Sequence, residues 1–269
     1  MAGQPAKEKW LGSQPRFPSF PFRAIAIETS RLQGVSMERV LFELCGKNPA
    51  IRFSPYVWRI RLALARKDLP FRAEPIRFTD KSPIAASGSA TVPVLREGAA
   101  WVADSWVIVR HLEKTYPEKP SLLGAGGEAF SFFVQNWVNG SLLPVMFRII
   151  CTDIQHMLGA TDAAYFYETR SKRIGMPLEE TLKHREANLA RLKETLAPVR
   201  NVLKDQPFLS GAEALYPDFL LFGAFQWARL TSPLDLQKDA PEISAWFKKI
   251  AAAYDAAVPK LETPPLLAA

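Results

Sequence analysis

The spacing of hydrophobic and polar residues changes repeatedly along the first part of the chain. The apolar run within residues 38–46 predicts a strand buried on both faces, as in a parallel or mixed sheet. Residues 55–67 carry apolar side chains at helical spacing, which predicts a helix whose basic residues, Arg59 and Lys67 among them, face water. Residues 71–78 predict a second strand, and the strand–helix–strand order indicates a right-handed crossover and a parallel pair.

Turn-forming residues divide the next stretch into short elements. Residues 79–90 are polar and contain glycine and serine, which predicts a loop or a poorly formed helix. Residues 91–103 predict a hairpin entered through Pro93, a residue that cannot donate to a strand ladder. An amphipathic helix is expected from Asp104, and the proline-rich residues 116–120 predict a domain boundary.

From about residue 128 onward the pattern predicts helices throughout. Residues 217–230 would form a helix that is apolar on nearly every face, so we expect it to be the central buried helix of this domain. Residues 179–203 predict a helix that Pro198 kinks or restarts. Its core-facing stripe is predicted to contain Leu182, Leu189, Leu192, Leu196, Val199 and Leu203.

These patterns predict an α/β domain followed by an all-helical domain. We expect the first domain at residues 38–120, the second at 126–257, and a flexible tail at 258–269. Residues 1–37 are rich in proline, glycine, serine and arginine, which is typical of a disordered extension. A targeting segment and a translation start at Met37 both remain open alternatives for this stretch.

Composition indicates an ordinary soluble protein. The 269 residues are 48% hydrophobic and 23% charged, and no stretch of about twenty apolar residues predicts a membrane helix. The formal net charge is +7, but basic and acidic residues alternate along the predicted helices. We therefore expect a solvated surface that binds neither nucleic acid nor membrane, with a mildly basic rim able to attract an anionic small molecule.

Cysteine and histidine usage argues against a metal site. The two cysteines, Cys45 and Cys151, are far apart and form no CxxC pair, so we expect no disulfide framework and a reducing cytoplasm. His111, His156 and His184 lack the spacing of metal ligands. The predicted chemistry therefore uses no metal.

The candidate chemistry begins at the Ser54-Pro55 pair. Serine is a preferred N-cap residue and proline a preferred first residue of a helix. Ser54 should therefore lie at the positive end of a helix dipole, where an anion is stabilised and a thiol with a free pKa of about 8.5 ionises more readily. The alternative is that Ser54 only caps the helix.

The order of elements resembles the glutathione transferase superfamily, which has a thioredoxin-like N-terminal domain and an all-α C-terminal domain. The resemblance depends on Ser54 after the first strand, Val92-Pro93 before the third, and Asp104-Ser105 at a helix start. It implies that Ser54 holds the glutathione sulfur as a thiolate. It further implies that Val92, before a cis Pro93, pairs with the cysteinyl unit, and that Asp104 and Ser105 bind the γ-glutamyl group.

Residues 54–59, 101–108 and 195–200 look like segments of bacterial lignin β-etherase-type transferases. That resemblance implies glutathione-dependent cleavage of β-aryl ethers, with glutathione as co-substrate, in a cytoplasmic homodimer. Two other functions stay open: a general detoxifying transferase or peroxidase, and a non-catalytic binding module.

The hydrophobic aromatic acceptor is expected to contact the helical domain. One or two of its apolar residues should line the acceptor pocket, the candidates being Trp137, Met146, Phe147 and Trp227.

The sequence differs from related proteins at two sites, the start of the first helix and the start of the central helix. A redox thioredoxin would have cysteine at positions 54 and 57, where this chain has serine and valine, so disulfide exchange lacks a nucleophile. Asp218 is present where the superfamily has an N-cap box, but Leu215 replaces the capping serine or threonine. That replacement predicts a cap weakened by about 1 kcal/mol.

Overall fold

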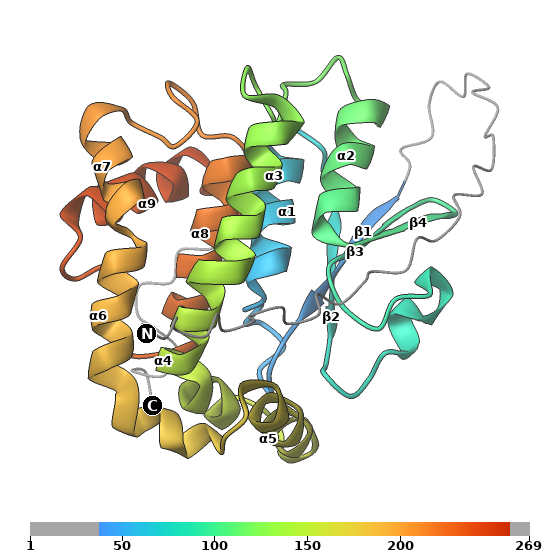
Figure 1. Ribbon diagram of the computed structural model, residues 1–269. Helices are drawn as coiled ribbons and strands as arrows, with labels where there is room; N and C mark the ends of the chain where they lie inside the picture. Colours follow the sequence, from blue (N-terminus) through green and yellow to red (C-terminus); the bar gives the residue numbers. More distant parts are fainter. Residues whose placement is uncertain (1–37, 259–269) are drawn as a thin grey trace, which may run out of the picture. The chain divides into compact units, whose positions relative to one another are not determined.

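The computed structural model describes residues 38–258, so the predicted extension at 1–37 and nearly all of the predicted tail lie outside the described residues. A four-stranded sheet with its helices comes first along the chain, and helices follow (Figure 1). The first part comprises β1 (Arg39–Leu44), α1 (Pro55–Arg66), β2 (Arg72–Ile76), the 3-10 helix η1 (Ser82–Ser87), β3 (Val94–Glu97), β4 (Ala100–Ala103) and α2 (Ser105–Thr115). The second part comprises α3 (Gly127–Trp137), the π-helical turn η2 (Val138–Leu142), α4 (Leu143–His156), α5 (Ala160–Ile174), the 3-10 helix η3 (Leu178–His184), α6 (Arg185–Thr195), α7 (Ala197–Asp205), α8 (Tyr216–Thr231) and α9 (Pro241–Ala253).

The sheet has the order β2-β1-β3-β4. β1 pairs in parallel with β2 and antiparallel with β3, and β3 and β4 form the predicted hairpin. Every residue of β1 is buried, Arg39 and Glu43 included, as burial on both faces predicted. Successive side chains alternate between the faces, so Leu41 packs in the core that includes the helices, while Val40 and Phe42 pack with Ile84 of η1 on the other side.

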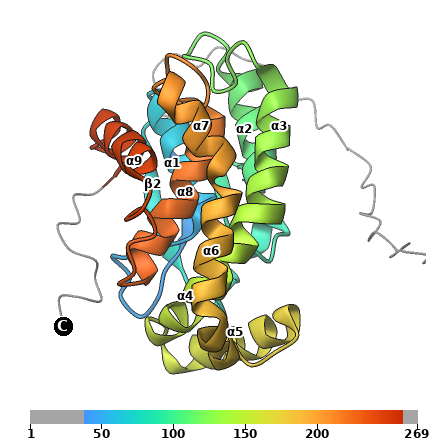
Figure 2. The same cartoon turned by 60° about the vertical axis from the view of Figure 1, so that its left-hand side comes forward.

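α8 is the predicted central helix and lies directly beside α1 (Figures 1 and 2). The two helices approach closely because Gly223 has no side chain: a Cβ there would lie 2.4 Å from the backbone oxygen of Pro55. This contact fixes the first turn of α1, and with it the position of Ser54. Among residues 38–258 no helix, α8 included, has the length and apolar character needed to cross a membrane.

Two basic residues of α1 do not face water as predicted. Arg59 is fully buried, because α8 packs closely on α1 beside it, and its guanidinium donates to Asn139 Oδ1 of the π-helical turn at 3.3 and 3.4 Å. Lys67 is 1% exposed, because α2 and the loop after it cover the end of α1. Its Nζ donates to the Tyr116 carbonyl at 3.0 Å and pairs with Glu113 at 2.8 Å, which compensates for its burial.

The leucine stripe predicted over residues 179–203 is wrong at its start. Leu182 and Leu189 are 45% and 37% exposed, whereas Leu192, Leu196 and Val199 are buried and Leu203 is half-buried. Residues 178–184 form a 3-10 helix, whose side chains repeat every three residues, so the helical period assumed for Leu182 does not apply. Leu189 lies in α6, on a side of that helix that other elements do not cover fully. The restart predicted at Pro198 is confirmed, since α6 ends at Thr195 and α7 begins at Ala197.

A buried hydrogen-bonded group joins the sheet to α2. Burial opposes ionisation of Glu97, but hydrogen bonds from His111, Tyr116 and Arg39 outweigh it and lower the pKa of Glu97 to about 2. The carboxylate is therefore charged at neutral pH and ties β3 to α2. This connection holds the second half of α2, the helix whose N-terminus carries Asp104 and Ser105.

Candidate active site

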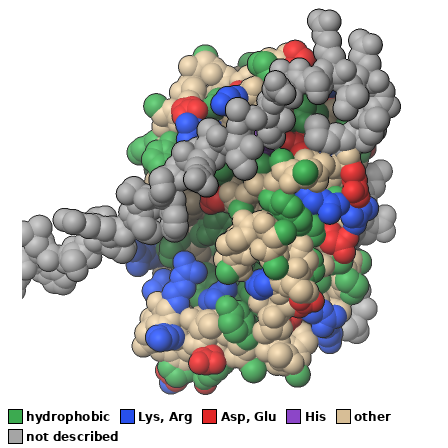
Figure 3. All heavy atoms as spheres, turned by 90° about the vertical axis from the view of Figure 1, so that its right-hand side faces the viewer, with side chains coloured by type: hydrophobic (Ala, Val, Ile, Leu, Met, Phe, Trp, Pro, Cys, Tyr) green, Lys and Arg blue, Asp and Glu red, His purple; other side chains and the backbone are tan. Residues whose placement is uncertain are grey.

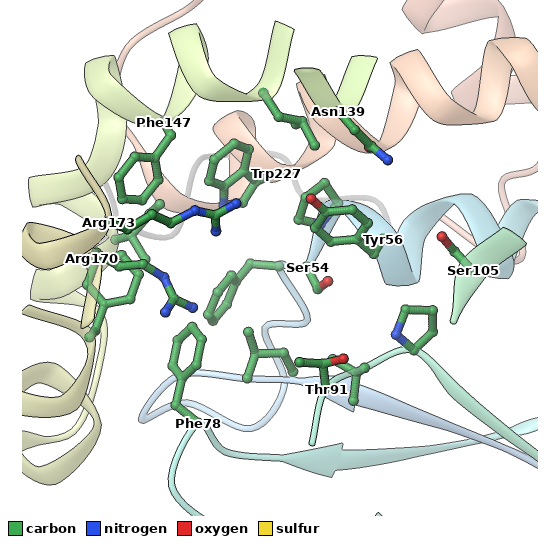
Figure 4. A pocket seen from close by; sticks show the side chains of 18 of the residues that line it. Ser54, Tyr56, Phe78, Thr91, Ser105, Asn139, Phe147, Arg170, Arg173 and Trp227 are labelled. Carbon is green, nitrogen blue, oxygen red and sulfur yellow. The ribbon is translucent and has the colours of Figure 1, made fainter. Parts of the chain in front are cut away.

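The structure brings the five predicted site residues to one cavity of about 580 Å³. Ser54, Val92, Pro93, Asp104 and Ser105 all line it. They come from the start of α1, the turn into β3 and the start of α2. In Figure 4 Ser54 lies in the middle of the labelled side chains, with Ser105 on one side and Arg170 on the other.

Ser54 precedes α1 in an extended conformation, and its side chain makes no capping hydrogen bond. Its backbone oxygen accepts from Val57 N at 3.1 Å and from Trp58 N at 3.2 Å, so the helix begins without help from the hydroxyl. Within residues 38–258, Ser54 Oγ has no hydrogen-bond partner. The geometry therefore does not support the alternative in which Ser54 only caps the helix.

Val92 and Pro93 are joined by a cis peptide bond, as expected. Pro93 O accepts from Asp104 N at 3.3 Å, which connects this turn to the start of α2. In the described part of the chain, the N–H and C=O of Val92 have no protein partner. Val92 therefore brings an unpaired donor and an unpaired acceptor to the cavity lining, which an extended peptide could pair with.

Asp104 is the N-cap of α2: its Oδ1 accepts from Trp106 N at 2.8 Å and from Val107 N at 3.1 Å. Its backbone has φ of 76°, a region that costs a residue with a side chain on the order of 1–3 kcal/mol. The residue is exposed, whereas Ser105 is only 4% exposed. Asp104 therefore presents a carboxylate at a helix N-terminus, beside a buried hydroxyl.

Asn139 is a lining residue that the sequence reasoning missed. It lies in the π-helical turn between α3 and α4, and such turns often occur at functional sites. Its Oδ1 holds the buried Arg59, whose guanidinium lies 4.7 Å from the ring centroid of Tyr56. The Asn139-Gly140 pair inside an apolar helix was the signal available in the sequence.

Aromatic rings form a continuous wall at one end of the cavity. Phe147 stacks on Trp227 with centroids 6.4 Å apart, and Phe166 lies 6.1 Å from Phe147 and 5.6 Å from Phe78. Phe147 and Trp227 were two of the aromatic candidates from the sequence, whereas Met146 is fully buried in the core. This end of the cavity can hold a flat aromatic molecule.

Basic side chains line the same cavity, namely Lys81, Arg148, Arg170 and Arg173. Sequence reasoning placed such residues on solvated helix faces. Within the described residues no three His, Cys, Asp or Glu side chains are grouped as metal ligands would be. The cavity thus combines an unpaired hydroxyl, the unpaired backbone groups of Val92, an aromatic wall and positive charge.

Comparison with known proteins agrees with the fold and the predicted superfamily. The glutathione S-transferase N-terminal domain model matches residues 53–115, and the C-terminal domain model matches residues 129–256. Glutathione S-transferase DHAR2 of Arabidopsis thaliana is 37% identical over 87 residues, which cover 30% of this chain and 41% of that protein.

Solved structures show the same fold. Glutathione transferase GSTFuA3 from Phanerochaete chrysosporium has a TM-score of 0.72 and 24% identity, and covers 80% of this chain and 96% of its own. Glutathione S-transferase CsGST63524 of Ceriporiopsis subvermispora, solved with glutathione, has a TM-score of 0.73 and 19% identity, and covers 83% of this chain and 99% of its own.

The fold is therefore a thioredoxin-like domain with a four-stranded mixed sheet, followed by a helical domain. The two family models together match the greater part of the sequence. The chain belongs to the glutathione S-transferase superfamily.

Proposed function

We propose that this protein is a glutathione transferase that activates glutathione as a thiolate and directs it at a hydrophobic aromatic electrophile. The observation that carries the proposal is the position of Ser54. Its unpaired hydroxyl lies at the start of α1, in the cavity that Val92 and the aromatic wall also line. The helix dipole and the hydroxyl both stabilise a negative sulfur there.

The residues around Ser54 suit the rest of glutathione. The free N–H and C=O of Val92 can pair with the cysteinyl unit. The Asp104 carboxylate suits the γ-glutamyl ammonium, and the Ser105 hydroxyl at the positive end of α2 suits its carboxylate.

The reaction forms a carbon–sulfur bond, and the leaving group departs with the electron pair of the bond that breaks. The thiol proton goes to solvent before attack. In a β-aryl ether the bond that breaks joins carbon to the aryl oxygen, and a phenolate leaves. We propose ether cleavage as one form of this reaction, because of the etherase-like residues 54–59 and 101–108 and because the aromatic wall can stack an aryl group.

The proposal is tested with immobilised glutathione and two electrophiles, chlorodinitrobenzene and a β-aryl ether. We expect retention on the resin and formation of a glutathione conjugate, detected by mass spectrometry. Retention without any conjugate would identify a binding module, and no retention would contradict the proposal. Conjugation of chlorodinitrobenzene without release of a phenol from the ether would exclude ether cleavage and identify a general transferase.

We also propose a homodimer, supported by an apolar face on α2 and α3. Val107, Phe130, Phe132 and Phe133 are exposed, Phe133 to 69%, and Trp106 packs on Phe132 at 5.6 Å, so the two helices share this face. We expect sedimentation velocity to show a dimer that Phe133→Ser weakens, since large exposed apolar patches mark contact sites. A monomeric wild-type protein at micromolar concentration would exclude this interface.

A further inference from the structure

The basic side chains of the cavity are not neutralised by the protein. Lys81, Arg148, Arg170 and Arg173 line the cavity, and among residues 38–258 none of them forms an ion pair with a carboxylate. Figure 3 shows Lys and Arg side chains gathered beside a hollow on the face that it presents. Positive charge is thus concentrated where the cavity has its aromatic wall.

Arg170 lies within that wall. Its guanidinium carbon is 5.4 Å from the ring centroids of both Phe78 and Phe166, and its Nη1 donates to Thr169 Oγ1 at 3.0 Å. Burial lowers the pKa of Arg170, and the charge of Arg173 lowers it further. A guanidinium held beside a second cation, with no counter-ion, favours an anion in the space between them.

Arg173 lies three residues after Arg170 on α5, so the two side chains share one helix face. Like charges at this spacing destabilise a helix, and an anion bound to both would reverse that cost. Figure 4 shows both side chains on the far side of Ser54 from Ser105, beside Phe147 and Phe78. This is the end away from the proposed γ-glutamyl site.

Of the four cations, Lys81 is the one whose positive charge is most nearly offset by a nearby carboxylate. Burial lowers the pKa of Lys81, while the nearby Asp162 opposes that change. Asp162 is itself engaged, since its Oδ1 accepts from the Thr79 N–H at 2.9 Å and from the Thr79 hydroxyl at 2.7 Å. The unbalanced charge therefore centres on Arg170 and Arg173.

We propose that the acceptor substrate is an aromatic acid, whose ring packs on the aromatic wall and whose carboxylate is bound by Arg170 and Arg173. This inference rests on the proposed function and names its substrate class. Guanidinium groups bind carboxylates through paired hydrogen bonds, and the rings of Phe78 and Phe166 hold the Arg170 guanidinium beside the aromatic wall. The reacting carbon of such a substrate would then face the sulfur held at Ser54.

The test compares a chlorodinitrobenzoate, whose carboxylate lies para to the chlorine, with its methyl ester. In both, glutathione sulfur bonds to the carbon that carries chlorine, and chloride leaves with the bonding electrons. Arg170→Gln and Arg173→Gln should each lower kcat/KM for the acid about tenfold or more, because a charged hydrogen bond is lost, and change it for the ester less than about twofold. KM for glutathione should stay unchanged, and Arg170→Lys should retain part of the preference for the acid.

Lys172→Gln is the matched control, because Lys172 is exposed on the same helix, carries the same charge and does not line the cavity. An equal loss of kcat/KM for the acid and the ester would assign the arginines to the reaction itself. A raised KM for glutathione alone would assign them to glutathione binding. Either result would overturn the proposal. Calorimetry with dinitrobenzoate and its methyl ester measures the same preference without turnover. Binding of the acid that requires Arg170, with neither substrate converted, would keep the anion site and reject the transferase activity.

Discussion

Replacing Ser54 by alanine is expected to lower kcat for glutathione conjugation by about a hundredfold, which is the usual cost of removing one donor from a reacting anion. The hydroxyl has no partner among residues 38–258 and lies buried at the cavity wall, so its removal takes nothing from the helix cap. The helix dipole remains in the variant and still favours a negative sulfur. The variant should therefore be impaired rather than inactive.

The cause of the loss can be measured through the ionisation of bound glutathione. Thiolate absorbance, followed against pH, should give a thiol pKa below the free value of about 8.5 in the wild type and closer to it in Ser54→Ala. A higher pKa leaves less thiolate at neutral pH, so the variant should recover activity as pH rises. Ser244→Ala on α9, outside the cavity, is the control. Unchanged turnover in Ser54→Ala would show that the hydroxyl has no role in the reaction.

Contiguous patterns in the sequence predicted most of the fold. The apolar run of β1, the helical spacing of α1 and the hairpin signal before α2 each lie within a few residues, so local physics determines them. The proposed glutathione-binding residues were found for the same reason. Ser54, Val92 and Asp104 each stand in a short motif at the start of an element.

The acceptor end of the cavity could not be predicted in this way. Arg170 and Arg173 follow the same pattern as basic residues on a solvated helix face, and only the packing of α5 beside the Phe78 loop turns them into the cavity. Asn139 reaches the cavity through a π-helical turn, which shifts the register of side chains in a way that helical periodicity does not encode. Burial of Arg59 likewise depends on a partner 80 residues away.

The cap of α8 shows how local reasoning can locate a residue and misjudge its role. Leu215 has no capping side chain, as the sequence indicated. Asp218 nevertheless accepts from Leu215 N at 3.3 Å, and it also accepts from the backbone of Leu209 and Ser210 and from Trp246 Nε1 at 2.8 Å. One buried carboxylate thus joins α8 to α9 and to the loop after α7.

Asp218→Ala is therefore expected to lower the free energy of unfolding by about 4 kcal/mol, because it leaves buried donors unsatisfied at roughly 1–3 kcal/mol each. Burial raises the pKa of Asp218 and the hydrogen bonds oppose that rise, so the charge itself is costly and the neutral Asp218→Asn should lose less, about 2 kcal/mol. Urea unfolding followed by circular dichroism measures the free energy of unfolding of both variants. The control Asp205→Ala, at an exposed position on α7, should stay within about 0.5 kcal/mol of wild type.

A loss below about 1 kcal/mol in Asp218→Ala would mean that water satisfies these donors, and that the apolar contacts of α8 hold it against α1 without them. A loss near the expected value would instead show that this carboxylate holds α8 to α9 and to the loop after α7.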